Sequence, residues 1–398
     1  MLARISTPRL VLAAILAIFV YGVIAAMLGT ILPSLSARFG LTPAQNGNIA
    51  LAQALGLIIA SVSAGPLIDN KGKKTGLVIG LALIAIALFA LPSAGGYRSL
   101  MALLFLLGFG GGIIVTAANA LASDIDEQRR ASVLNLLNLF FGLGGLATPL
   151  LGVLLGSGAA KLAYTAAVLT AATLILHATT PMPAPSGERG FKGAKAGQLM
   201  GRGLLWLLSL LLFLYVSCEV GMWNWLTRHL IAQGIPEATA LSILSLGFAL
   251  GLLIGRVVVS RILIKIAAPT VTLAAAVLMA LTTFWILQTT NATGAWIAVF
   301  CAGLAMAPVY PTTLAMVGDA FPKATGTAMG IVITCGWIGL AVSSRIIGAI
   351  AGDDPKRLKT ALLVLPVSSA AMVLLNLILR AMLAKARSAA QPISPRRP

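Results

Sequence analysis

Charged residues are scarce in this sequence, and acidic ones are the scarcest. Only 10% of the 398 residues are charged, with 10 Asp and Glu against 28 Lys and Arg. A typical soluble domain carries about 25% charged residues, so this chain could not cover a soluble surface of its size. Because 59% of its residues are apolar, the chain is also not intrinsically disordered, since disorder requires low hydrophobicity.

Residues that build catalytic and metal sites are scarce as well. The three cysteines, Cys218, Cys301 and Cys335, lie far apart within apolar stretches, and the two histidines lie at the ends of such stretches. The sequence contains no disulfide framework, metal-ligand spacing, nucleophile elbow or phosphate loop. We therefore expect no metal, no cofactor and no enzymatic activity.

What the sequence does have is a series of long apolar stretches. Each has about 18 residues or more, and a helix of that length crosses roughly 30 Å of hydrocarbon. The stretches lie at 9–33, 45–64, 75–92, 99–121, 132–156, 163–180, 203–227, 238–259, 270–289, 295–317, 327–350 and 361–383. They predict an all-α membrane protein with twelve transmembrane helices.

The positive charges gather on one side of these stretches. If the N-terminus is cytoplasmic, 20 Lys and Arg lie on the cytoplasmic side, seven lie on the other side, and Arg345 lies inside a stretch. Such a bias sets the orientation of a membrane protein. We expect a multi-pass protein of the plasma (bacterial inner) membrane with both termini cytoplasmic. The basic surplus then describes orientation in the lipid bilayer and predicts no nucleic-acid partner.

The chain also repeats itself at half its length. The sequence Ala-Leu-Gly-Leu-Ile-Ile at 54–59 recurs as Ala-Leu-Gly-Leu-Leu-Ile at 249–254, a shift of 195 residues. The same shift superimposes 116–124 on 311–319, and Gly144 on Gly339. Six helices repeated in one orientation form two bundles with a substrate site between them near the middle of the membrane.

This repeat sets the expected domain organisation. We predict two pseudo-symmetric six-helix bundles, acting as a monomeric secondary transporter. The predicted parts are an N-terminal bundle at 1–180, a cytoplasmic linker at 181–202, a C-terminal bundle at 203–384 and a cytoplasmic tail at 385–398.

A short motif separates the second and third stretches. It reads Gly65-Pro-Leu-Ile-Asp69-Asn-Lys-Gly72-Lys73-Lys74 and resembles the loop signature of the major facilitator superfamily, with Asn and Lys where Arg is commoner. The resemblance covers the whole chain and implies that Asp69 faces the N-terminus of the eleventh helix, near Gly326-Thr327. An acid is stabilised at such a position, and the contact would hold the cytoplasmic side closed.

The other interpretation of this motif is a solvated loop that only sets topology. The equivalent loop of the second half, 255–261, lacks the acid, so any such latch is asymmetric. The residues assigned to this conformational gate are Gly65, Asp69, Gly72, Lys73, Lys74, Arg256 and Asp319.

Further segments look like the fucose/glucose-type sugar:proton symporters of that superfamily. They are 215–226, 307–313 and 318–337, with 116–119 and 134–138 in the first half. The resemblance implies import of a small neutral solute, a hexose-type sugar, together with a proton or sodium ion. Fucose symporters carry acids in the first and fourth helices, whereas this chain has Gly29 and Val115 there. A different residue must carry the proton.

Glu219 is the best candidate, because it is the one acid well inside an apolar stretch, the seventh. An ionised acid at such depth costs about 2.5–3.5 kcal/mol unless it is paired or hydrated. We interpret Glu219 as a proton carrier, an acceptor for sugar hydroxyls, or both. The alternative is a structural glutamate bonded to backbone or to Arg345. Arg345 itself either extends to the outer interface or pairs with Glu219 in one conformation.

The remaining substrate-binding candidates are neutral. Amides both donate and accept hydrogen bonds, as sugar hydroxyls require, and aromatic faces can stack on a sugar ring. Tyr310 lies between Pro308 and Pro311, where a broken helix would expose backbone to a cavity. Contacts between helices and an interfacial tryptophan belt are the alternative roles. The candidates are Gln53, Asn119, Asn135, Asn138, Trp223, Asn224, Trp225, Tyr310 and Trp337.

The predicted function is therefore symport by alternating access, with the Asp69 motif favouring the outward-facing state. Two other functions stay open. One is a proton antiporter that exports a drug-like or amphipathic molecule, since Gly144, Pro149 and Gly152 partly match the signature of such proteins. The other is a membrane sensor that does not transport.

Overall fold

The computed structural model describes residues 7–155, 159–183, 193–352 and 355–390, and these residues are almost entirely helical. Within these residues, twelve helices are long and apolar enough to cross a membrane, which confirms the predicted fold class. The first half contains α1 (Thr7–Phe39), α2 (Pro43–Lys71), α3 (Lys73–Ala90) with the short turn η1 (Leu91–Ser93), α4 (Tyr97–Ile125), α5 (Arg130–Leu154) and α6 (Ala159–Thr179).

The second half repeats this order, but three of its membrane helices are interrupted. The eighth has a π-helical segment, and the twelfth is divided into α15 and α16. The tenth breaks at Ala307-Pro308, close to where the prolines predict a break. The elements are α8 (Gly203–Ala232), α9 (Glu237–Ser242) with η2 (Ile243–Phe248) and α10 (Ala249–Ile262), α11 (Ala268–Gln288), α12 (Ala292–Met306) with α13 (Val309–Ala320), α14 (Thr325–Ala351), and α15 (Pro355–Ala361) with α16 (Val364–Ala390).

Several helices run further than their apolar stretches. α2 continues from the predicted edge at 64 to Lys71, so most of the expected loop motif is helical. Only Gly72 separates α2 from α3, with φ of +92°, a backbone conformation that favours glycine. Helices continue into polar sequence here because the backbone hydrogen bonds do not depend on apolar side chains.

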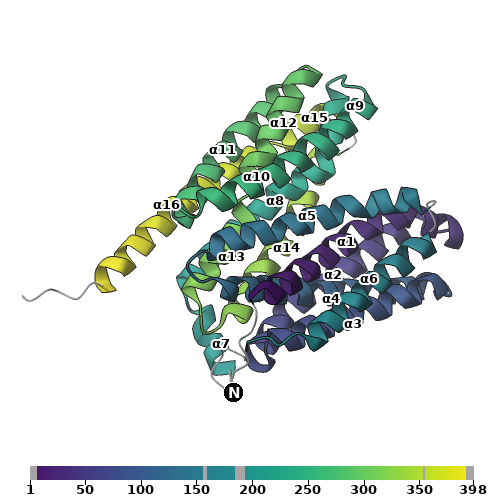
Figure 1. Ribbon diagram of the computed structural model, residues 1–398. Helices are drawn as coiled ribbons and strands as arrows, with labels where there is room; N and C mark the ends of the chain where they lie inside the picture. Colours follow the sequence, from purple (N-terminus) through teal and green to yellow (C-terminus); the bar gives the residue numbers. More distant parts are fainter. Residues whose placement is uncertain (1–6, 156–158, 184–192, 353–354, 391–398) are drawn as a thin grey trace, which may run out of the picture.

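The linker and the tail also differ from simple loops. Of the predicted linker, residues 184–192 lie outside the described residues, and Gly193–Met200 form helix α7. Residues 385–390 of the predicted tail continue α16, and 1–6 and 391–398 lie outside the described residues. α7 lies at the lower end of the molecule as drawn in Figure 1. We call this the linker end.

Glycines allow helices within each bundle to touch through their backbones. A Cβ on Gly56 of α2 would lie 2.2 Å from the carbonyl oxygen of Phe105, and one on Gly108 of α4 would lie 2.0 Å from that of Gln53. The residues 195 positions later, Gly251 and Gly303, approach α12 and the α9–α10 helix in the same way. Small residues are a common means of packing membrane helices. The repeat seen in the sequence is therefore a repeat of helix contacts.

The two bundles meet along one part of their length and diverge toward the end that carries α9 and α15 (Figure 1). Between the bundles, α2 packs on α14, and α5 packs on α10 and α13. At the α2–α14 crossing a Cβ on Gly330 would lie 2.3 Å from the Ser61 carbonyl oxygen. This crossing involves the half of α2 and the half of α14 nearest the linker end.

Two glycines of α1 test this packing. A Cβ on Gly22 would lie 2.1 Å from the Phe141 carbonyl oxygen of α5, whereas Gly29 has nothing within 4 Å. Overpacking typically costs about 1–3 kcal/mol, so Gly22→Ala should lower the thermal unfolding temperature of the purified protein. Gly29→Ala on the same helix should leave that temperature unchanged or slightly higher. Equal effects of the two substitutions would contradict the predicted α1–α5 contact.

Candidate functional site

Three side chains of α8 form a stripe near the middle of the protein that faces α10, α13 and η2 of the same bundle. Tyr215, Glu219 and Trp223 are four residues apart, so they share one face of the helix. Because α8 continues to Ala232, Glu219 lies within two residues of its midpoint, closer to the centre than the sequence predicts. Exposure rises along the stripe from 0% at Tyr215 to 39% at Trp223, which is the residue of the three farthest from the linker end.

Other helices bring polar side chains to this stripe. The ring of Tyr310, from α13, lies 6.5 Å from that of Tyr215. Arg256 of α10 and the Tyr215 and Tyr310 hydroxyls lie close enough to Glu219 to interact with it electrostatically. Tyr21 of α1 faces Tyr310 in the same way. We call Tyr21, Tyr215, Glu219, Arg256 and Tyr310 the central cluster.

Arg256 has an unusual position in this cluster. Its side chain is 5% exposed, and its Nη1 donates a 2.6 Å hydrogen bond to the Asn138 carbonyl oxygen of α5, in the other bundle. Its Nε and the Tyr310 hydroxyl have no hydrogen-bond partner among the described residues. No ion pair of 4.0 Å or less joins Arg256 to Glu219. The acid and the base therefore face each other with unused hydrogen-bonding capacity between them.

In this conformation Arg256 lies beside Glu219, and no ion pair joins Arg345 to Glu219. Arg345 is exposed on α14, and neither a hydrogen bond nor an ion pair joins it to another described residue. Arg256, the cation beside Glu219, is one of the residues assigned to the conformational gate from the sequence. It lies inside α10 and within the predicted stretch 238–259, but nothing in the sequence placed it next to Glu219.

The amide candidates contact one another or lie apart from Glu219. Asn138 donates to Asn119 Oδ1 at 3.1 Å, which joins α5 to α4, and Asn135 donates to the Thr312 hydroxyl of α13 at 3.0 Å. All three asparagines are buried. Gln53 lies on α2 in the half away from the linker end, where its backbone approaches Gly108. The alternative role, contact between helices, describes the three asparagines well.

The tryptophan candidates divide between two faces. Trp223 lies on the α8 stripe, edge-on to Phe248 at 5.2 Å. Trp225 packs against Gly348 of α14 and lies under Arg228, so it faces away from the stripe. Between them, Asn224 donates to the Ser344 hydroxyl at 3.3 Å. Half-buried Trp337 of α14 has no hydrogen-bond partner for its indole nitrogen.

At the linker end, the Asp69 carboxylate binds the first turn of α14. It accepts hydrogen bonds from the backbone nitrogens of Gly326 and Thr327 at 2.9 and 2.8 Å, and from the Thr327 hydroxyl at 2.6 Å. These are unpaired donors at a helix N-terminus, where a negative charge is favourable. Gly65 lies in the same contact, since a Cβ there would be 2.5 Å from Thr327 Cα. The contact is at the place that the resemblance implies.

Two ion pairs lie at the same end. Lys73 pairs with Asp124 inside the first bundle, whereas Arg130 pairs with Asp319 across the two bundles. Arg130 also donates to the Ser123 carbonyl oxygen at 2.7 Å. The repeat makes Asp124 and Asp319 equivalent, yet each has its own type of partner, so the gate is asymmetric. Lys74 is half-buried at the start of α3.

Sequence reasoning missed several residues of these contacts. Arg130 and Thr312 were not assigned, and neither were Tyr21 and Tyr215 of the central cluster. Tyr215 had a usable signal, since it precedes Glu219 by one helical turn. Arg130 and Tyr21 had none, because their partners lie at distant positions of the chain.

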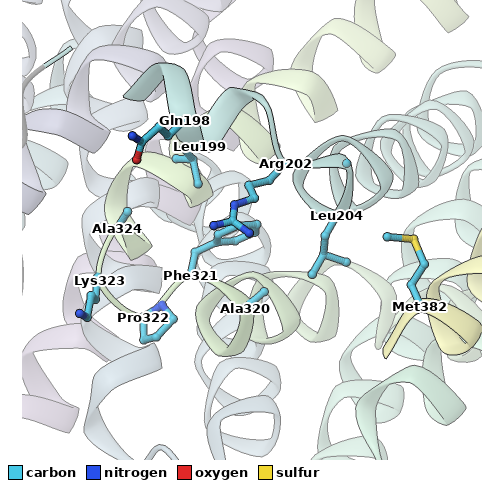
Figure 2. A pocket seen from close by; sticks show the side chains of 11 residues that line it. Gln198, Leu199, Arg202, Leu204, Ala320, Phe321, Pro322, Lys323, Ala324 and Met382 are labelled. Atoms are coloured by element: carbon cyan, nitrogen blue, oxygen red, sulfur yellow. The ribbon is translucent and has the colours of Figure 1, made fainter. Parts of the chain in front are cut away.

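The described residues also line a cavity of about 750 Å³ at the linker end. Figure 2 shows Arg202 directed into it, beside Phe321, with Leu204 and Met382 on one side. Its walls come from α7, the start of α8, the loop between α13 and α14, and the end of α16. It contains no residue of the central cluster and is a separate feature of the molecule.

The chain belongs to the major facilitator superfamily, whose family model matches residues 14–344. It is a membrane transporter of that superfamily. The fold is similar to that of the Escherichia coli fucose:proton symporter FucP, which in the outward conformation has a TM-score of 0.82, 19% identity and coverage of 93% of this chain and 98% of that one. The proton:xylose symporter XylE has a TM-score of 0.78 and 14% identity, with coverage of 92% of this chain and 94% of that one.

Two sequence relatives differ in how much of the chain they match. A glucose/galactose transporter of Brucella abortus is 25% identical over 354 residues, which cover 84% of this chain and 85% of that protein. The 4-hydroxybenzoate transporter PcaK of Pseudomonas aeruginosa is 34% identical over 128 residues, 32% of this chain and 28% of that protein. The chain thus matches less than a third of the 4-hydroxybenzoate transporters.

The Asp69 contact can be tested by Asp69→Asn. The amide lacks the charge and one acceptor oxygen, and hydrogen bonds to charged groups contribute about 1.5–3 kcal/mol. The ratio of open to closed linker ends should therefore rise roughly ten- to hundredfold. Spin labels at the exposed residues Gln128 and Lys323, one in each bundle, report this opening as a longer distance.

Asp126→Asn is the matched control, because Asp126 caps the backbone nitrogen of Arg129 in its own bundle. This variant should keep the distance distribution of the unmodified protein. An unchanged distribution in Asp69→Asn would show that the contact does not hold the bundles together.

Proposed function

We propose that this protein is a secondary active transporter that imports a small neutral solute, a hexose-type sugar, in symport with a proton or sodium ion. The observation that supports this function most directly is the position of Glu219. It lies at the middle of α8 and faces Arg256 and two tyrosine hydroxyls. A membrane acid of this kind marks a substrate or proton path.

The chemistry of the central cluster suits a polyhydroxylated solute. Sugar hydroxyls both donate and accept hydrogen bonds. The Glu219 carboxylate accepts, the Arg256 Nε donates, and the Tyr310 hydroxyl does either; the last two lack partners among the described residues. Trp223, one turn further on α8, offers an aromatic surface. The glucose/galactose transporter that aligns along most of the chain supports the same substrate class.

The orientation follows from the distribution of charge. Because most Lys and Arg flank the linker end, this end is proposed to face the cytoplasm, in the plasma (bacterial inner) membrane with both termini inside. Asp69 and Arg130 then close the cytoplasmic side, and the stripe on α8 is reached from outside. The high TM-score with FucP in the outward conformation supports this assignment. Import would follow when two bundles, near 1–180 and 203–384, rock about the central cluster in a monomer.

A second substrate class has its own support. The 34% identity with 4-hydroxybenzoate transporters, together with a buried arginine beside tyrosines, fits a small aromatic carboxylate. Such a ligand would pair with Arg256 directly. Both substrate classes should be tested in the same assay.

The test is uptake by purified protein in proteoliposomes with imposed proton or sodium gradients, using D-glucose, L-fucose and 4-hydroxybenzoate as probes. Glu219→Gln should abolish accumulation against a gradient while sparing exchange, because the amide cannot carry the proton. Glu237→Gln, at the start of α9, is the matched control. Accumulation by Glu219→Gln would contradict the coupling role. Ion flux opposite to the substrate would identify an antiporter, and absence of all flux would favour a sensor.

Two neighbouring tryptophans give a second test. Trp223→Ala should weaken sugar binding about tenfold, since aromatic contacts contribute roughly 0.5–1.5 kcal/mol beyond buried area. Trp225→Ala should leave binding unchanged, because that ring packs on α14. Isothermal titration of the purified variants with D-glucose measures both. The reverse order of the two effects would place the sugar on the other face of α8.

A further inference from the structure

Arg256 links the central cluster to the contact between the bundles. It donates to the Asn138 carbonyl oxygen of α5 at 2.6 Å, and it faces Glu219 in its own bundle. A Cβ on Gly142 of α5 would lie 3.3 Å from its Nη1, so the guanidinium fills the α5–α10 crossing. Among the contacts described between the bundles, this one shares a side chain with the central cluster.

The repeat shows that helix packing alone does not require an arginine here. Arg256 is equivalent to Ser61, 195 residues earlier, and the α5–α10 crossing is equivalent to the α2–α14 crossing. At the latter a serine suffices, with its carbonyl oxygen against Gly330. A buried cation in place of that serine therefore needs an explanation other than packing.

Alternating access must break the hydrogen bond between Arg256 and Asn138. When the linker end opens, α5 separates from α10, and the guanidinium loses its acceptor in the other bundle. A buried charge left without a partner is strongly unfavourable. The carboxylate that faces Arg256 is Glu219, on α8 of the same bundle, so this acceptor moves together with the arginine.

We propose that Arg256 exchanges partners, from the Asn138 carbonyl oxygen when the linker end is closed to the Glu219 carboxylate when it is open. This proposal rests on the proposed transport function but not on the identity of the substrate. The exchange makes the opening of the linker end depend on the charge of Glu219. Arg256 is thus a positioning residue that determines which forms of the transporter can change conformation.

The consequences match the requirements of symport. With Glu219 ionised and no substrate, Arg256 has a partner in both conformations, so the empty transporter returns freely. With Glu219 protonated and no substrate, opening would leave Arg256 without a hydrogen-bond acceptor, so a proton does not cross alone. A bound solute with hydroxyl or carboxylate oxygens supplies the missing acceptor, and the loaded form can open.

The groups that face Glu219 determine how its charge affects Arg256. Tyr215 lies on its own helix, Arg256 comes from α10 and Tyr310 from α13. Arg256 is the cation in this set, and the two tyrosines are neutral at ordinary pH. Neutralising Glu219 therefore removes the anion that would receive Arg256.

The test measures the distance between spin labels at Gln128 and Lys323 without substrate, at pH 8, in protein whose three cysteines have been replaced. The unmodified pair should show closed and open populations. Glu219→Gln, which mimics the protonated acid, should lower the open fraction at least about tenfold. Glu219→Gln combined with Arg256→Gln should restore the open fraction to near its original value, because the variant has no buried guanidinium that would lose its acceptor.

Two controls separate charge from shape. Glu219→Gln with Arg256→Lys keeps the cation and should stay closed, and Glu237→Gln should behave like the unmodified protein. Partner exchange is wrong if Glu219→Gln opens normally, or if removing Arg256 from it does not restore opening. If the unmodified protein never opens, even with saturating D-glucose and 4-hydroxybenzoate, alternating access itself fails, and the proposed function fails with it.

Discussion

The carboxylate of Asp69 joins the two bundles through the first turn of α14, and the rest of the arrangement depends on this contact. Three hydrogen bonds to Gly326 and Thr327 use donors that α14 cannot satisfy itself. The contact is possible because Gly65 and Gly330 let α2 and α14 touch through their backbones. With the linker end held in this way, the bundles diverge at the other end (Figure 1), and the stripe on α8 becomes accessible there.

The crossing between α5 and α10 contains a charged residue, Arg256, whereas the crossing between α2 and α14 contains small residues. Arg256 donates to the other bundle and also faces Glu219, so a change at the central cluster reaches the closed end through one side chain. The acid and the base of the central cluster, Glu219 and Arg256, are both in the second bundle. The two bundles therefore have different roles despite their repeated packing: the first supplies neutral amides and carbonyl acceptors, and the second supplies the titratable group.

The fold was largely predictable from the sequence, because apolar length and the repeat are properties of contiguous segments. The Asp69 contact was predictable because the motif is local and its target is a helix N-terminus. The partner of Glu219 was not, since Arg256 lies 37 positions away on another helix, and hydropathy does not show which faces of two helices meet. The same limit applies to Asn119, Asn135 and Asn138: their residue type permits binding, but only their positions show that they contact each other and Thr312.

The central claim is that the stripe on α8 opens away from the linker end while Asp69 and Arg256 hold that end closed. The substitution Trp223→Cys, in protein without its native cysteines, tests it most directly. In oriented membrane vesicles without substrate, a membrane-impermeant maleimide should label this cysteine rapidly from the face opposite the linker end and not from the face that carries the linker end. Labelling from the linker-end face alone would contradict the account.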